Sequence, residues 1–240
     1  MPQCTSRKFG FGWRLVLLVA LFGAARRIDA QQPAAQETPP YPNMAPIAQY
    51  RMDRDAEIAL ARTAAPASIS RDAQIMVLGE KNFDVAVPGK NGFVCAVGRA
   101  FAGPLSNPEF WNPKNRSPIC YNAAAARSLW PYAMKQTGMA LAGASKAQIT
   151  DAVRAAVARK ELGPPDAGSM AYMMSKRAYL TDQGGHNLAH VMFELPRGGV
   201  FQNDPDYFVS WDPAPVIEFN VPVGQWSDGT PVHMASGKRG

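Results

Sequence analysis

Residues 73–99, AQIMVLGEKNFDVAVPGKNGFVCAVGR, contain three apolar runs with the length of β-strands. The runs cover residues 73–78, 83–87 and 93–99, and short gaps rich in Gly, Asn and Pro separate them. Gaps this short favour antiparallel hairpins, because a parallel connection needs a crossover of about a dozen residues. The stretch therefore predicts a sheet that begins with three consecutive strands.

Three helical segments are expected in the rest of the chain, over about residues 53–65, 122–142 and 145–162, with Asp53 and Asn122 as the N-caps of the first two. The last is the clearest. Ser145 and Gln148 form a capping box at its start, and Gly163 followed by two prolines ends it. Pro131 ends or kinks the middle segment, because proline lacks the N–H that a helix interior needs.

Further strands are expected at residues 170–174, 190–196 and 216–223, whereas the four prolines within residues 101–121 predict a loop. The total is three or four helices and about six strands, without strict alternation of strand and helix. This order favours an α+β fold. We expect a single domain in which a mostly antiparallel sheet carries the helices.

The first thirty residues have the layout of a secretory signal peptide. Arg7, Lys8 and Arg14 precede a short apolar run at residues 15–22, and Ala30 stands at the expected cleavage point. The run is too short to cross a bilayer, since a spanning helix needs about 20 apolar residues. No integral membrane span is therefore expected after cleavage. Retention of the leader as an amphipathic anchor is the alternative.

The remainder of the chain is nearly neutral. The whole chain has a net charge of +6, but five basic residues and one acidic residue of the leader account for +4 of it. Residues 31–49, rich in Pro, Gln and Ala, are expected to be a disordered tether, and residues 50–240 a globular domain. A net charge of +2 without a Lys/Arg run excludes the usual electrostatic footprint of nucleic-acid binding.

Two cysteines remain after the leader, which contains Cys4, is removed. Cys95 and Cys120 are expected to form a disulfide, because an even pair in an oxidising compartment is most simply bridged. Two free thiols or a metal site are the alternatives. Neither cysteine belongs to a CxxC motif or has a histidine near it in the sequence, so no metal site is predicted with them.

Two of the three histidines, His186 and His190, lie four residues apart behind a Gly pair. On a helix this spacing would place both rings on one face, where they could share a metal ion. The following segment HVMFELP has a strand pattern instead, and residues four apart on a strand are about 13 Å from each other. We therefore predict a ligand-binding or structural role for these histidines in preference to a metal site.

Other candidate site residues follow from chemistry and position. Glu194, Asp182 or Lys176 could assist an acid/base histidine. Tyr172 and Trp111 could contact a ligand through their rings. No phosphate-binding glycine motif and no complete nucleophile motif is present, so no cofactor is expected.

Several short segments resemble stretches of uncharacterised exported bacterial proteins. They are NGFVC (91–95), PEFWNPK (108–114), MSK (174–176) and HVMF (190–193). In those proteins the stretch that corresponds to residues 186–190 is richer in histidine, and Leu188 occupies one such place here. The resemblance implies export and a single domain, and it implies nothing about a reaction.

Three functions remain open from the sequence. The first is a periplasmic or secreted protein that binds a small polar ligand or ion near His186 and His190. The second is a cell-envelope hydrolase that uses His190 as acid or base. The third is a non-catalytic module that binds envelope glycan or peptide through Trp111, Trp211 and Trp226, which predicts that these rings share an exposed face.

Overall fold

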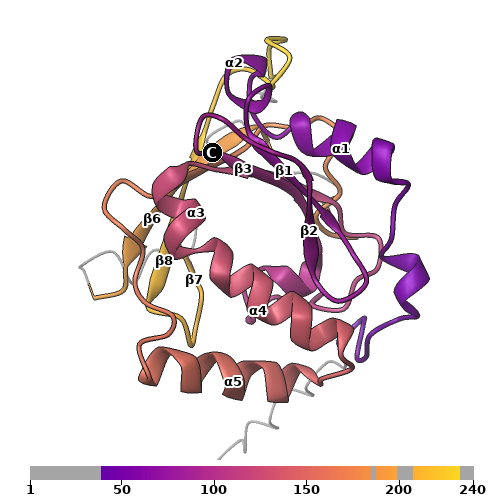
Figure 1. Cartoon of the computed structure of the whole chain (residues 1–240), viewed down its shortest axis with the longest axis vertical. Helices are drawn as coiled ribbons and strands as arrows, with labels where there is room; N and C mark the ends of the chain where they lie inside the picture. The colour runs from indigo at the N-terminus through magenta and orange to yellow at the C-terminus, as the bar shows by residue number, and fades with distance from the viewer. Residues whose placement is uncertain (1–38, 185–187, 199–207, 233–240) are drawn as a thin grey trace, which may run out of the picture. The chain divides into compact units, whose positions relative to one another are not determined.

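The structure is a computed structural model that describes residues 39–184, 188–198 and 208–232 (Figure 1). The expected signal peptide and residues 31–38 of the expected tether lie outside these residues. The α-helices are α1 (Arg54–Arg62), α2 (Ala67–Ser70), α3 (Ala123–Ser128), α4 (Trp130–Leu141) and α5 (Lys146–Ala158). The strands are β1 (Gln74–Leu78), β2 (Phe83–Val87), β3 (Val94–Gly98), β4 (Ser117–Tyr121), β5 (Met170–Met173), β6 (His190–Pro196), β7 (Phe208–Ser210) and β8 (Val216–Pro222).

The described strands form one sheet in the order β2-β1-β3-β4-β5-β6-β8-β7, which confirms the α+β class. The sheet is mixed, because β1 and β3 pair in parallel while the other six neighbouring pairs are antiparallel. Eight strands and five α-helices are present in the described residues, instead of about six strands and three or four helices.

The first predicted hairpin is confirmed, and the second is wrong. β1 and β2 pair across the turn at Gly79–Asn82, with Leu78 opposite Phe83. The loop after β2 then crosses the start of β1, so that β3 lies on the other edge of β1. The physical reason is burial: four of the five residues of β1 are buried, whereas Asp84 and Val85 of β2 are exposed. The apolar strand takes a central position and the amphipathic strand becomes an edge.

Two strands were not expected from the sequence. β4 lies within the proline-rich segment that predicted a loop, and it contains the buried Pro118. Proline is tolerated there because β5 pairs with β4 only at Cys120 and Tyr121, beyond the position of Pro118. β7 is only three residues long, too short to give a periodic signal.

The helix caps agree closely with the sequence analysis. Asp53 accepts a hydrogen bond from the Ala56 N–H at 3.0 Å, and Asn122 accepts one from the Ala125 N–H at 2.9 Å. The capping box of α5 is complete. The middle helical segment is divided into α3 and α4, with Pro131 in the first turn of α4.

Helices cover the two faces of the sheet differently. Figure 1 shows the sheet curving around α3 and α4, with α1 on the opposite, outer face of β1 and β3. The inner core contains Met76, Ala96, Tyr121, Tyr132 and Met192, among others. The outer core lies beneath α1 and includes Leu60, Ile75, Val97, Cys95 and Cys120. Because side chains alternate along a strand, each buried strand supplies both cores.

The Cys95–Cys120 disulfide is present in the structure. The two residues are directly opposite each other in the antiparallel β3–β4 pair, and both are fully buried. The bridge therefore joins two central strands on the α1 side of the sheet.

The folded region begins earlier than residue 50. Tyr41, Met44 and Ile47 of the expected tether pack against the inner core. A 3₁₀ helix, η1 (Ile47–Gln49), leads into Tyr50, whose hydroxyl donates to the Trp111 carbonyl at 2.7 Å. No helix of the described residues is long and apolar enough to span a membrane.

Candidate ligand-binding site

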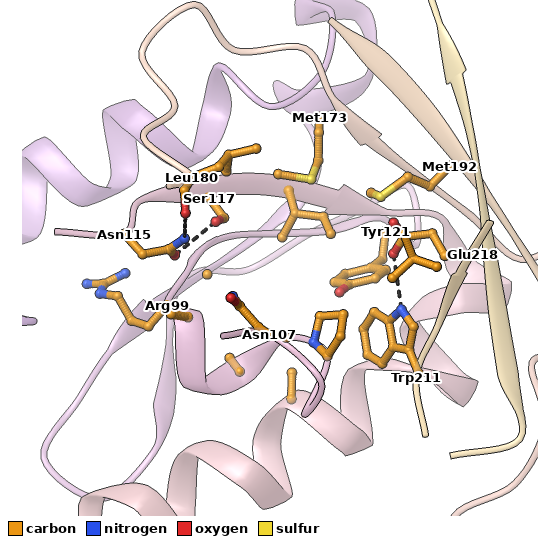
Figure 2. A pocket seen from close by; sticks show the side chains of 18 of the residues that line it. Arg99, Asn107, Asn115, Ser117, Tyr121, Met173, Leu180, Met192, Trp211 and Glu218 are labelled. Carbon is orange, nitrogen blue, oxygen red and sulfur yellow. Dashed lines mark hydrogen bonds between the residues drawn. The ribbon is translucent and has the colours of Figure 1, made fainter. Parts of the chain in front are cut away.

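A cavity of about 240 Å³ lies on the inner face of the sheet (Figure 2). Apolar side chains from several elements form much of its lining: Phe83, Ile119, Trp130, Met173, Met192 and Val209. A second group of lining residues is polar and comes mainly from β4, β6 and β8: Ser117, Tyr121, His190, Glu218 and Asn220. The cavity is therefore amphipathic, which is typical of small-molecule sites.

Strand alternation and register bring the polar wall together. His190, Met192 and Glu194 alternate on β6 and so share its inner face. Across the β6–β8 pair, Glu194 is opposite Glu218 and Met192 is opposite Asn220. The Cβ atoms of such cross-strand partners are about 5 Å apart, so the two glutamates are immediate neighbours.

His190 faces the cavity as a neutral ring. Its Nδ1 lies 2.8 Å from the Leu188 carbonyl oxygen, to which a protonated Nδ1 donates. Burial lowers the pKa of His190, because a charged ring would be poorly solvated there. With the proton on Nδ1, the Nε2 atom is a hydrogen-bond acceptor.

Glu194 and Glu218, which we call the carboxyl pair, are both buried, with 3 % and 9 % of their surface exposed. Burial raises the pKa of both groups, and the charge of Glu218 raises that of Glu194 further. The Trp211 indole donates to Glu218 Oε2 at 3.2 Å, and this bond together with the Asn220 amide opposes the rise at Glu218. Neither carboxyl oxygen of Glu194 has a hydrogen-bond partner among the described residues.

Tyr121, Trp211 and Glu218 are grouped at one end of the cavity, as Figure 2 shows. Tyr121 is fully buried, and its pKa is raised mainly by burial and then by the two nearby carboxyls. The Oδ1 atom of Asn220 is buried and has no hydrogen-bond partner among the described residues. This end therefore contains several polar groups that the fold itself does not saturate.

The opposite end of the cavity is saturated by the protein. Asn115 donates to the Leu180 carbonyl at 2.8 Å and accepts from the Ser117 hydroxyl at 2.9 Å (Figure 2). Arg99 donates to Glu57 at 3.0 Å and to the carbonyl of Tyr50 at 2.7 Å. The guanidinium of Arg99 is thus occupied in holding α1 to the sheet.

Of the histidine candidates, His190 lines the cavity, and His186 lies outside the described residues. Glu194 lies on the inner face beside Glu218, but it is not one of the residues that line the cavity. Lys176 is on the surface, where it forms an ion pair with Asp228 at 2.8 Å.

The remaining candidates are separate from the cavity lining. Tyr172 is half-buried on the outer face, with its ring centroid 6.3 Å from that of Phe93. Trp111 is buried, with its ring 4.6 Å from that of Phe110. Asp182 accepts hydrogen bonds from Tyr179 at 2.8 Å and Lys114 at 3.0 Å, and it joins exposed loops.

The three tryptophans proposed for envelope binding do not form one exposed group. Trp111 and Trp211 are each only 4 % exposed, and Trp226 is half-buried. Trp211 instead lines the cavity. An exposed aromatic platform built from these rings is therefore not part of the structure.

Glu218, Asn220 and Tyr121 were not among the site residues expected from the sequence. A signal for Glu218 was present, because a charged residue in the middle of the apolar strand VIEFNVP (216–222) is unusual. Its orientation toward the interior and its pairing with Glu194 were not visible without the strand register. Within the described residues, no group of three or more His, Cys, Asp or Glu side chains could hold a metal ion.

Comparison with known proteins adds no further information about this site. No protein-family model matches the sequence, and searches of curated proteins and of solved structures found no match either.

Proposed function

We propose that this chain is an exported protein that binds a small amphipathic molecule in the cavity between the sheet and α4, with His190 as one of its contacts. The observation that carries the proposal is the cavity itself, which combines an apolar lining with polar groups not used by the fold. Its volume of about 240 Å³ lies just below the usual range of about 300–1,000 Å³ for ligand pockets. The ligand is therefore small.

Export is supported by the disulfide. Disulfides form and persist in oxidising compartments, and Cys95–Cys120 joins two central strands. Together with the leader pattern at residues 1–30, this favours a periplasmic or secreted location.

The proposal is tested by filling the cavity. Ala133 of α4 is buried and lines the cavity, whereas Ala140 of the same helix is equally buried and does not. Small molecules that raise the melting temperature of the wild type are first selected from a library of polar and amphipathic compounds, since binding to the folded state stabilises it. We expect Ala133→Leu to abolish these shifts and Ala140→Leu to retain them. Shifts that survive in a folded Ala133→Leu variant would contradict binding in the cavity.

Hydrolysis with His190 as acid or base is the second candidate. The observation in its favour is that Nδ1 of His190 is engaged with Leu188, while the ring lines the cavity. Lys176 would not assist in this geometry, because it is bound to Asp228 on the surface. Turnover of envelope-derived esters, amides or glycosides by the wild type, lost in His190→Gln, would favour this candidate. A folded His190→Gln variant with full turnover would exclude it.

A further inference from the structure

We infer that the ligand carries a protonated amine, which binds at the end of the cavity formed by Glu218, Asn220 and Trp211. This inference rests on the proposed function and specifies the chemical class of the ligand. It concerns the polar end of the cavity, where the groups left unsaturated by the fold share one hydrogen-bonding character.

The unsaturated groups at this end are mainly acceptors. At this end Glu218 presents a carboxyl group and Asn220 a buried Oδ1 without a partner, and further along β6 His190 presents Nε2 to the cavity. The indole N–H of Trp211 is a donor, but it is already bound to Glu218. A ligand that fits this wall must supply donors, and an ammonium group supplies three donors and no acceptor.

The charge balance points in the same direction. Neither Glu194 nor Glu218 forms an ion pair with a Lys or Arg of the described residues. Among the described residues, burial and then the two carboxyls raise the pKa of Tyr121 of β4, and both Tyr121 and His190, which lies four residues before Glu194 on β6, are neutral near pH 7. An uncompensated buried carboxylate is unfavourable, so a cation entering the cavity would stabilise the ionised form.

Glu194 is a second, independent observation that points to a ligand, because it is buried and has no hydrogen-bond partner among the described residues. It is almost completely buried, and its position on β6 directs it to the same inner face as His190 and Met192, which line the cavity. Beside Glu218, it adds a second carboxyl that has no partner among the described residues. The pair thus places more acceptor capacity beside the cavity than the fold uses.

The rest of the cavity suits an apolar body attached to the amine. The rings of Phe83 and Trp130 and the side chains of Ile119 and Met173 contribute to its lining. Phe83 and Trp130 contact each other at a centroid distance of 5.1 Å, and Tyr121 lies 5.9 Å from Trp130. A small arylalkyl or alkyl amine combines the two required features, a donor-rich charged head and an apolar tail.

Binding of such a cation has a measurable consequence. In the free protein the two carboxyls are neighbours in a buried place, where burial raises the pKa of both and like charges disfavour joint ionisation. A bound ammonium favours the ionised form, so its binding is coupled to the release of a proton from the pair. Amine affinity is therefore expected to rise with pH over the range in which the pair is protonated.

The test uses three probes of similar size: phenethylamine, the neutral 2-phenylethanol and the anionic phenylacetate. Isothermal titration calorimetry near pH 7, in buffers of different ionisation enthalpy, measures affinity and proton release together. We expect phenethylamine to bind at least about tenfold more tightly than 2-phenylethanol and to release protons. Phenylacetate should bind most weakly, because it brings a negative charge to an end that already contains the carboxyl pair.

Variants separate the carboxyl contribution from general packing. Glu218→Gln keeps the shape and should lose about tenfold in phenethylamine affinity, with little change for 2-phenylethanol. Glu194→Gln should reduce proton release with a smaller loss of affinity, because Glu194 does not line the cavity. Glu80→Gln, an exposed glutamate, is the control and should behave as the wild type. Proton release by the wild type needs no variant, so the test stands even if Glu218→Gln does not fold.

The outcomes distinguish the two levels of the proposal. Equal binding of amine and alcohol without proton release would overturn the preference for a cation and leave the cavity as a binding site. Failure of all three probes to bind the wild type, together with no stabilising compound in the library screen, would overturn the proposed function as well.

Discussion

Buried glutamates occur in two regions of this sheet, and the two regions differ in the partners that the described residues give them. Beneath α1, Glu57 accepts from Arg99 at 3.0 Å and from the Leu78 N–H at 3.1 Å. Between β6 and β8, Glu194 and Glu218 lie side by side without a cation from the described residues. A protein tolerates an uncompensated buried pair where something other than folding stability depends on it. The region beneath α1, which we call the supporting region, thus differs from the proposed binding region between β6 and β8.

The two regions also differ in what packs on the outer face of the sheet. β1, β3 and β4 have α1 on one face and the inner core on the other, and the disulfide joins β3 to β4. The outer face of β6 is open by contrast, with Phe193 and Leu195 exposed by 40 % and 36 %. The disulfide and the buried Arg99–Glu57 ion pair thus lie in the supporting region, whereas the Arg197–Asp212 ion pair beside β6 and β8 is partly exposed.

The ion pair of the supporting region gives the largest expected effect. Arg99→Met leaves Glu57 buried without its counter-ion, so we expect a loss of about 3–5 kcal/mol in the free energy of unfolding. Urea denaturation near pH 7 measures it. Arg154→Met, which breaks the exposed pair with Asp151, is the control and should cost less than about 0.5 kcal/mol. Equal small losses in both variants would remove the distinction between the two regions.

The disulfide should come next. In the loop-closure description, joining residues 95 and 120 stabilises the folded state by about 3.5 kcal/mol. The Cys95→Ala/Cys120→Ala variant is expected to lose that amount in urea denaturation. Wild-type protein unfolded in urea with reductant present should have the same free energy of unfolding as the variant. Equal stability of the variant and the oxidised wild type would show that the covalent link adds nothing to the supporting region.

The carboxyl pair should destabilise the fold at high pH. Burial raises the pKa of Glu194 in the folded state above its unfolded value of 4.5, so stability falls as pH rises from about 4.5 through the raised folded value. Glu194→Gln removes this fall, and a gain of about 1–2 kcal/mol near pH 8 is expected. Stability measured from pH 5 to 8 tests it, with Glu80→Gln as the unchanged control. A wild-type curve that is flat over this range would contradict the uncompensated pair.

His190 should have the smallest effect on the free energy of unfolding, and the effect should appear below about pH 6.5. Burial lowers its pKa in the folded state, so stability is lost as pH falls from about 6.5 toward the lowered folded value. In His190→Gln this loss should shrink by about 1 kcal/mol or less near pH 5. Unfolding curves at pH 5 and pH 7 give the difference. If the variant lost the same stability between pH 7 and pH 5 as the wild type, the loss would come from groups other than His190.

Much of the local structure could be predicted from the sequence. The caps at Asp53, Asn122 and Ser145 were identified correctly, because a cap depends on groups within about three residues of each other. The β1–β2 hairpin and the Cys95–Cys120 bridge followed from a short turn and from the number of cysteines. His190, predicted as a candidate ligand contact, lines the cavity.

The composition of the cavity wall could not be predicted in this way. Tyr172 and Lys176 were chosen for their chemistry and their proximity to His190 in the chain, yet they lie on the outer face and on the surface. Glu218, Asn220 and Tyr121 are far from His190 in the sequence and reach the cavity through the pairing of distant strands. Alternation indicates that a strand has two faces, but not which face meets the cavity.

The sequence by itself determined the α+β class, the positions of most helices and strands and the cysteine pair, because these depend on local patterns and on counting. Only the tertiary structure decided that β3 pairs in parallel with β1, and that Glu194 is opposite Glu218. Strand order depends on which apolar edges and faces are buried together by the whole chain, and a shift of one residue in register would turn Glu218 away from the cavity. The candidate site is therefore a product of register.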